Sequence, residues 1–76
     1  MKVFFDTNVL VYLFDVDSPD KREKARGLFA RHVEAGDVLL STRVLQEFYV
    51  AVTRKLARPL DAAVAAEVVS SLARLP

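Results

Sequence analysis

One short segment, VFFDTNVLVYLF over residues 3–14, constrains the fold most, because a single carboxylate, Asp6, interrupts its apolar run. Burying an unpaired charge is costly, so Asp6 must lie at an opening between buried elements or bind a partner. The apolar residues before it predict a strand over 2–5, of the kind that a parallel sheet buries on both faces. The apolar residues after it predict a short buried helix over 9–14.

The rest of the sequence predicts three more helices and a second strand. In chain order they are a helix over 19–35 between Ser18 and Gly36, a strand over 38–40, a helix over 43–56 capped by Ser41 or Thr42, and a helix over 62–75 capped by Asp61. This order predicts an α/β fold in which a short parallel sheet is flanked by helices. We expect one domain over residues 1–76, without a linker.

Composition narrows the class of protein. The chain of 76 residues is 53% hydrophobic and 28% charged, which is typical of one small globular domain. Its net charge of +1 gives no general support for a nucleic-acid partner. The lack of cysteine excludes disulfides and thiolate metal sites. No apolar run can span a membrane, and Asp6 comes too early for a signal peptide, so we expect a cytoplasmic protein.

Two carboxylates beside apolar segments are candidate metal ligands. Asp6 ends a predicted strand, at the sheet edge where open α/β folds bind ligands, and Glu47 has mostly apolar neighbours at helical spacing. Carboxylate oxygens suit hard cations such as Mg²⁺ or Mn²⁺. Simpler interpretations stay open, since Asp6 could cap the next helix and Glu47 could reach water, paired with Arg43.

The polar neighbours of these carboxylates leave similar alternatives open. Thr7 and Asn8 could orient the carboxylate before them or could only cap a helix. Arg43 and Arg54 are candidate phosphate contacts, although basic residues such as Arg54 also suit a helix C-terminus. His32 has no second His or Cys at ligand spacing, and we expect it to be structural.

The segment FFDTNVLVYLFD, followed after a helix by LLSTRVLQEFYVAVTRK, resembles the N-terminal half of PIN domains, with the closest likeness to bacterial VapC-type toxins. The resemblance spans essentially the whole chain. It implies a PIN-like three-layer fold and a metal-dependent ribonuclease, in which acidic side chains hold Mg²⁺ or Mn²⁺ for attack of water on RNA. It places Asp6 and Glu47 at the first two acidic positions, with Asn8 beside the first and Thr7 in the same motif.

The resemblance also implies partners and a departure from the family. Toxin members pair with an antitoxin, and many form homodimers. The remaining acidic residues of the family lie in a C-terminal half that has no counterpart here, so we expect about half of the usual domain, weakly active or inactive alone. The apolar circumference of the helix predicted over 62–75 indicates that further chain or another subunit covers it.

A second function is compatible with the sequence. A non-catalytic half-domain could pair with itself or with another chain through uncovered apolar surface. A third interpretation, an aspartyl phosphatase or phospho-receiver domain, also places an aspartate after the first strand. The phosphatase pattern requires a second aspartate two positions later, where this sequence has Asn8, and this argues against it.

Overall fold

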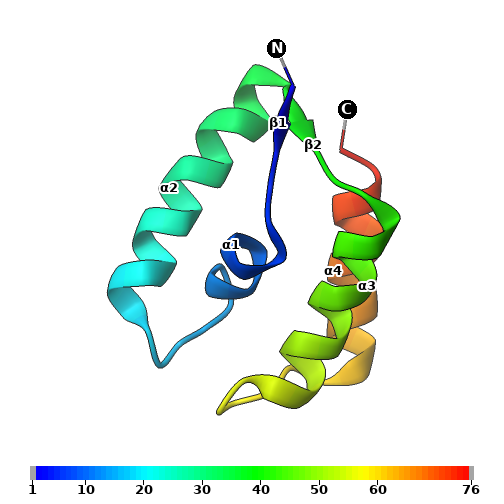
Figure 1. Ribbon diagram of the computed structural model, residues 1–76. Helices are drawn as coiled ribbons and strands as arrows, with labels where there is room; N and C mark the ends of the chain where they lie inside the picture. The colour runs from blue at the N-terminus through cyan, green and yellow to red at the C-terminus, as the bar shows by residue number, and fades with distance from the viewer. Residues whose placement is uncertain (1, 76) are drawn as a thin grey trace.

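The computed structural model describes residues 2–75 (Figure 1). The elements in chain order are β1 (Val3–Phe4), α1 (Thr7–Tyr12), α2 (Pro19–Ala35), β2 (Val38–Leu39), α3 (Thr42–Val50), the π-helical turn η1 (Ala51–Lys55) and α4 (Ala62–Ala73). The two strands form a parallel sheet, with Val3 opposite Val38 and Phe4 opposite Leu39. The predicted α/β class, with a short parallel sheet and flanking helices, is confirmed.

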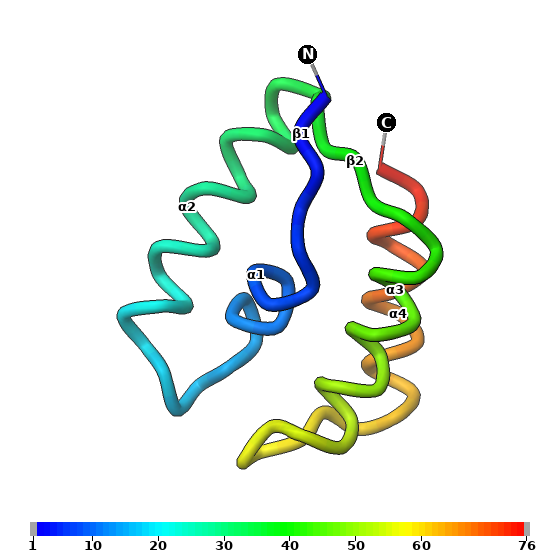
Figure 2. Tube along the Cα trace, viewed as in Figure 1, coloured from blue at the N-terminus to red at the C-terminus, as the bar shows by residue number. Residues whose placement is uncertain are grey.

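The short helix α1 lies at the centre of the helical layer. It packs against both α2 and α3, while α4 packs against α3 and η1 (Figure 2). The three most deeply buried large side chains, Leu10, Phe48 and Val52, come from α1, α3 and η1. The core therefore joins α1 to the continuous α3–η1 segment, and this contact sets the relative position of Asp6 and Glu47.

Local signals place both ends of α2 and the start of α4 correctly, whereas the single helix predicted over 43–56 is α3 followed by the π-helical turn η1. Helix α2 covers the predicted residues 19–35, because Pro19 suits a first helical position and Gly36 adopts the left-handed conformation at φ 71°. The Ser41 side chain caps α3, with the Val44 N–H donating to its Oγ at 3.1 Å. Helix α4 ends at Ala73, two residues before the predicted end.

The predicted helix over 9–14 is wrong by two residues at each end, since α1 covers Thr7–Tyr12. The cause is that Asp6 occupies the N-cap position. Its backbone carbonyl accepts hydrogen bonds from the N–H groups of Val9 at 3.1 Å and Leu10 at 3.4 Å. The sequence alone does not show which residue is the N-cap, because three consecutive residues are of types that cap helices: Asp6, Thr7 and Asn8.

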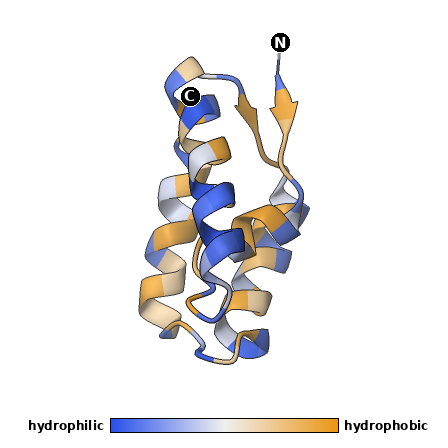
Figure 3. Ribbon diagram, turned by 90° about the vertical axis from the view of Figure 1, so that its left-hand side faces the viewer, coloured by the Kyte–Doolittle hydropathy of each residue, from blue (hydrophilic) through white to orange (hydrophobic). Residues whose placement is uncertain are grey.

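The expectation that the first strand is buried on both faces is also wrong. Phe5 is buried and packs edge-on against Phe29, with ring centroids 5.2 Å apart. Phe4, however, is 65% exposed, and Leu39 beside it on β2 is 39% exposed. Figure 3 shows that both strands are apolar along their length. The sheet therefore presents apolar side chains on one uncovered face.

Two side chains of α2 differ in their surroundings. Leu28 is 39% exposed. His32 has the expected structural surroundings, because its Nδ1 lies 2.9 Å from Asp37 Oδ1 and its ring packs edge-on against Phe5. Over residues 2–75, no helix is both long and apolar enough to cross a membrane.

Candidate active site

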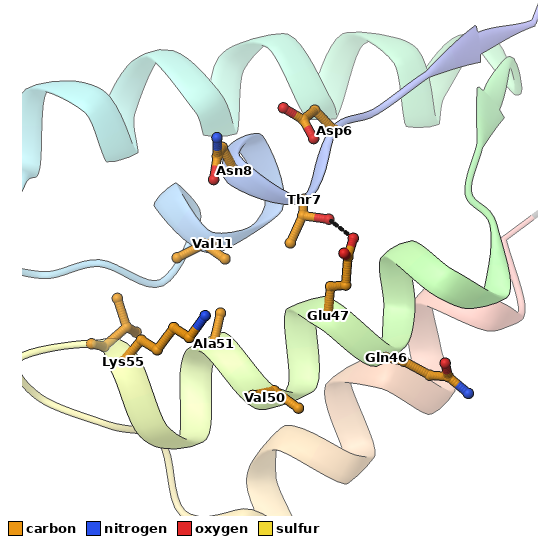
Figure 4. A pocket seen from close by; sticks show the side chains of 10 residues that line it. Asp6, Thr7, Asn8, Val11, Gln46, Glu47, Val50, Ala51 and Lys55 are labelled. Carbon is orange, nitrogen blue, oxygen red and sulfur yellow. Dashed lines mark hydrogen bonds between the residues drawn. The ribbon is translucent and has the colours of Figure 1, made fainter.

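A cleft of about 660 Å³ lies between α1 and the α3–η1 segment (Figure 4). Its lining combines two carboxylates, a hydroxyl, two amides and one ammonium group with an apolar floor. The residues are Asp6, Thr7, Asn8, Val11, Gln46, Glu47, Val50, Ala51, Lys55 and Leu56. The structure therefore brings together four of the residues singled out from the sequence, although Asp6 and Glu47 are 41 positions apart in the chain.

Asp6 is exposed at the mouth of this cleft, at the N-cap of α1. An N-cap aspartate usually accepts a hydrogen bond from the backbone of the following turn. The Asp6 side chain accepts none from that turn, and within residues 2–75 its capping is done by the backbone carbonyl alone. The interpretation of this carboxylate as a side-chain cap is therefore not supported, and both of its oxygens are available to a ligand.

Glu47 approaches the cleft from α3, with its side chain 51% exposed. Thr7 Oγ1 donates a hydrogen bond to Glu47 Oε1 at 3.0 Å, and Figure 4 shows the two side chains pointing toward each other. Arg43 Nε lies 3.7 Å from Glu47 Oε2, the pairing anticipated from the sequence. Thr7 thus orients the second carboxylate, whereas the sequence suggested an action on the first.

The other candidates differ in position. Asn8 is exposed and lines the cleft beside Asp6. Arg43 is 85% exposed, is not part of the cleft lining and lies 3.7 Å from Glu47 Oε2. Arg54 does not line the cleft, but the adjacent Lys55 does. Lys55 was not singled out from the sequence, because the helical register that separates it from Arg54 cannot be read from spacing alone.

The donor atoms fit a hard, hydrated cation. The uncharged polar and acidic side chains that line the cleft all offer oxygen atoms, from carboxylate, hydroxyl and amide groups, and oxygen ligands suit Mg²⁺ or Mn²⁺. In the part of the chain that the structure describes, no group of three or more His, Cys, Asp or Glu side chains could enclose a metal ion. Two carboxylates can still bind Mg²⁺, because this ion keeps several of its water ligands.

Comparison with known proteins adds one finding. A family model described as PIN domain matches residues 3–76, which includes every residue that lines the cleft. No curated protein and no solved structure matches the chain significantly.

Proposed function

Because the chain belongs to the PIN domain family, whose members are generally nucleases, we propose that it is a metal-dependent endoribonuclease of the VapC toxin type. Asp6 and Glu47 are the proposed metal ligands and catalytic residues, and Thr7 and Asn8 support them. The observation that carries the proposal is the Asp6 carboxylate, which occupies an N-cap position without a capping bond and shares a cleft with Glu47. A bound Mg²⁺ or Mn²⁺ would activate water and stabilise the charge that develops on the RNA phosphate.

The side chains of the cleft have separate roles in this proposal. The hydrogen bond from Thr7 takes up Glu47 Oε1 and leaves Oε2, which lies 3.7 Å from Arg43 Nε, as the oxygen that faces a ligand. Arg43 offsets part of the negative charge at Glu47, and Asn8 adds an amide beside Asp6. The cleft volume of about 660 Å³ lies within the usual range of ligand sites. With two carboxylates in the site, we expect the 76-residue chain to be weakly active alone.

The experiment is Mn²⁺-dependent cleavage of an unstructured RNA, with EDTA as the metal-free control. Asp6→Asn should abolish cleavage. The matched control is Asp61→Asn, because Asp61 is also an exposed N-cap aspartate whose side chain makes no capping bond within the described chain, and it lies outside the cleft. Asp61→Asn should cleave like the wild type. Equal cleavage by the wild type and Asp6→Asn would disprove the assignment.

The proposed context is cytoplasmic, where a cysteine-free chain needs no oxidising compartment. A cognate antitoxin and a homo-oligomer are the proposed protein partners. The exposed apolar side chains Phe4 and Val64, 65% and 48% exposed, support an oligomer and also the second candidate function, a non-catalytic interaction module. Sedimentation tests the interaction, since a stable monomer at high concentration would argue against both the oligomer and this second function.

A further inference from the structure

The segment that carries Glu47 changes its helical form within the cleft. Helix α3 ends at Val50, and the next turn, η1, is π-helical. The Leu56 N–H donates to the Ala51 carbonyl at 3.2 Å, the five-residue spacing that defines such a turn. Single π turns are rare and occur frequently at functional sites. Two η1 residues, Ala51 and Lys55, line the cleft.

The wider turn determines which basic residue lies on the face of Glu47. In a regular α-helix, with 3.6 residues per turn, the positions that follow Glu47 on its own face are Ala51 and Arg54. A π turn contains more residues, so the position after Ala51 on that face moves on by one, to Lys55. The lining of the cleft agrees, because it includes Lys55 and not Arg54.

A side-chain hydrogen bond supports this local form. The Thr53 hydroxyl donates to the Tyr49 carbonyl at 2.7 Å and also lies 3.4 Å from the Val50 carbonyl. Such bonds back to the preceding turn compete with the regular backbone ladder and bend helices. Val52, between these residues and fully buried, anchors the turn in the core. The position of Lys55 is therefore built into the packed part of the fold.

Within the described residues, the Lys55 ammonium has no hydrogen-bond or ion-pair partner. Among residues 2–75 it takes part in none of the side-chain hydrogen bonds or ion pairs, whereas Arg43 pairs with Glu47 and Arg58 lies 3.7 Å from Asp17. Figure 4 shows Lys55 on the η1 side of the cleft, with the carboxylates of Asp6 and Glu47 also in view. A lysine binds phosphate as a point charge and needs no fixed fork geometry.

We propose that Lys55, directed into the cleft by the π-helical turn, binds a phosphate of the RNA strand beside the two carboxylates. This inference rests on the proposed ribonuclease function and adds the residue that holds the substrate backbone. It replaces Arg54 by Lys55 as the phosphate contact on this helical segment.

The test is binding of a fluorescently labelled, unstructured RNA oligonucleotide in EDTA, followed by fluorescence anisotropy at several salt concentrations. Each phosphate contact to a single strand contributes about 0.7 to the slope of log Kd against log salt. Lys55→Gln should lower the slope by about 0.7. The ratio of its Kd to the wild-type Kd should therefore be about fivefold larger at about 0.1 M salt than at about 1 M salt. Lys55→Arg should restore the slope. Arg54→Gln is the matched control, with the same charge change one position away, and should keep the wild-type slope.

The outcomes separate this inference from the function on which it rests. Equal slopes for Lys55→Gln and Arg54→Gln would overturn the role of Lys55, whatever the wild type does with Mn²⁺. A slope that depends on Lys55 in a chain that does not cleave RNA would support the phosphate contact and contradict the nuclease. A wild-type chain that binds no RNA would overturn both.

Discussion

The hydrogen bond between Thr7 and Glu47 links the first helix to the third and positions one of the two candidate metal ligands. It joins Thr7 Oγ1 to Glu47 Oε1 at 3.0 Å. Thr7→Val removes the donor and preserves the shape of the side chain, and Glu47→Ala removes the acceptor. A double-mutant cycle of these two variants isolates their interaction from effects of each substitution alone.

The size of this interaction follows from its exposure. A hydrogen bond to a charged group contributes about 1.5–3 kcal/mol to the free energy of unfolding when it is well formed. The Glu47 side chain is 51% exposed and keeps part of its hydration, so we expect a coupling of about 1 kcal/mol. In the Arg43–Glu47 pair, Nε and Oε2 are 3.7 Å apart and the Arg43 side chain is 85% exposed. The basic residue also precedes the acidic one along the helix, which is the weaker orientation for such a pair. Its coupling should not exceed about 0.3 kcal/mol.

Urea denaturation followed by circular dichroism gives both couplings in one series, with an Arg43→Ala, Glu47→Ala cycle as the control. The coupling for Thr7 and Glu47 should exceed the coupling for Arg43 and Glu47 by several tenths of a kcal/mol or more. A Thr7–Glu47 coupling below about 0.3 kcal/mol, or one no larger than the Arg43–Glu47 coupling, would refute the argument that this bond holds α1 and α3 in register.

Stability predictions at four positions follow from the helix boundaries and the core. Gly27→Ala should raise the free energy of unfolding by about 1 kcal/mol, because Gly27 lies within α2 and an added Cβ meets no atom within 4 Å among residues 2–75. Gly36→Ala should lower the free energy of unfolding by about 1 kcal/mol, because the φ of Gly36 is 71° and a side chain is strained there. If the two glycine variants changed the free energy of unfolding in the same direction, this reasoning would be wrong. Ser41→Ala should cost about 1 kcal/mol through loss of the cap, and Ser41→Asp should cost much less, which thermal unfolding can check. Phe48→Ala, at a fully buried position, should cost about 3–5 kcal/mol, and a loss below 1 kcal/mol would show that α3 does not pack as described.

Sequence reasoning succeeded where a single residue carries the structural signal. Pro19 and Gly36 mark the ends of α2 through backbone geometry that few other residues share. It failed where several adjacent residues carry the same signal, as at the start of α1, where Asp6 rather than Thr7 or Asn8 is the N-cap. The local sequence pattern also does not predict the exposure of Phe4, because an apolar strand does not show which of its faces the rest of the fold covers.

The candidate site was predictable in part for the same reason. Asp6 and Glu47 stand out because a carboxylate beside apolar residues is unusual, and this is visible in the sequence. The partner of Thr7 and the position of Lys55 depend on how α1 meets α3 and on the π-helical turn. That turn arises from a choice between competing hydrogen bonds, including the one made by Thr53, and no hydrophobic periodicity records it.

Direct measurement of Mn²⁺ binding tests the central claim that Asp6 and Glu47 form a metal site. Electron paramagnetic resonance reports the free Mn²⁺ concentration during a titration and needs neither RNA nor catalysis. We predict that the wild type and Asp61→Asn bind Mn²⁺ alike, and that Asp6→Asn and Glu47→Gln each weaken binding by about tenfold or more. Equal affinity in all four proteins, or no binding by the wild type, would contradict the account.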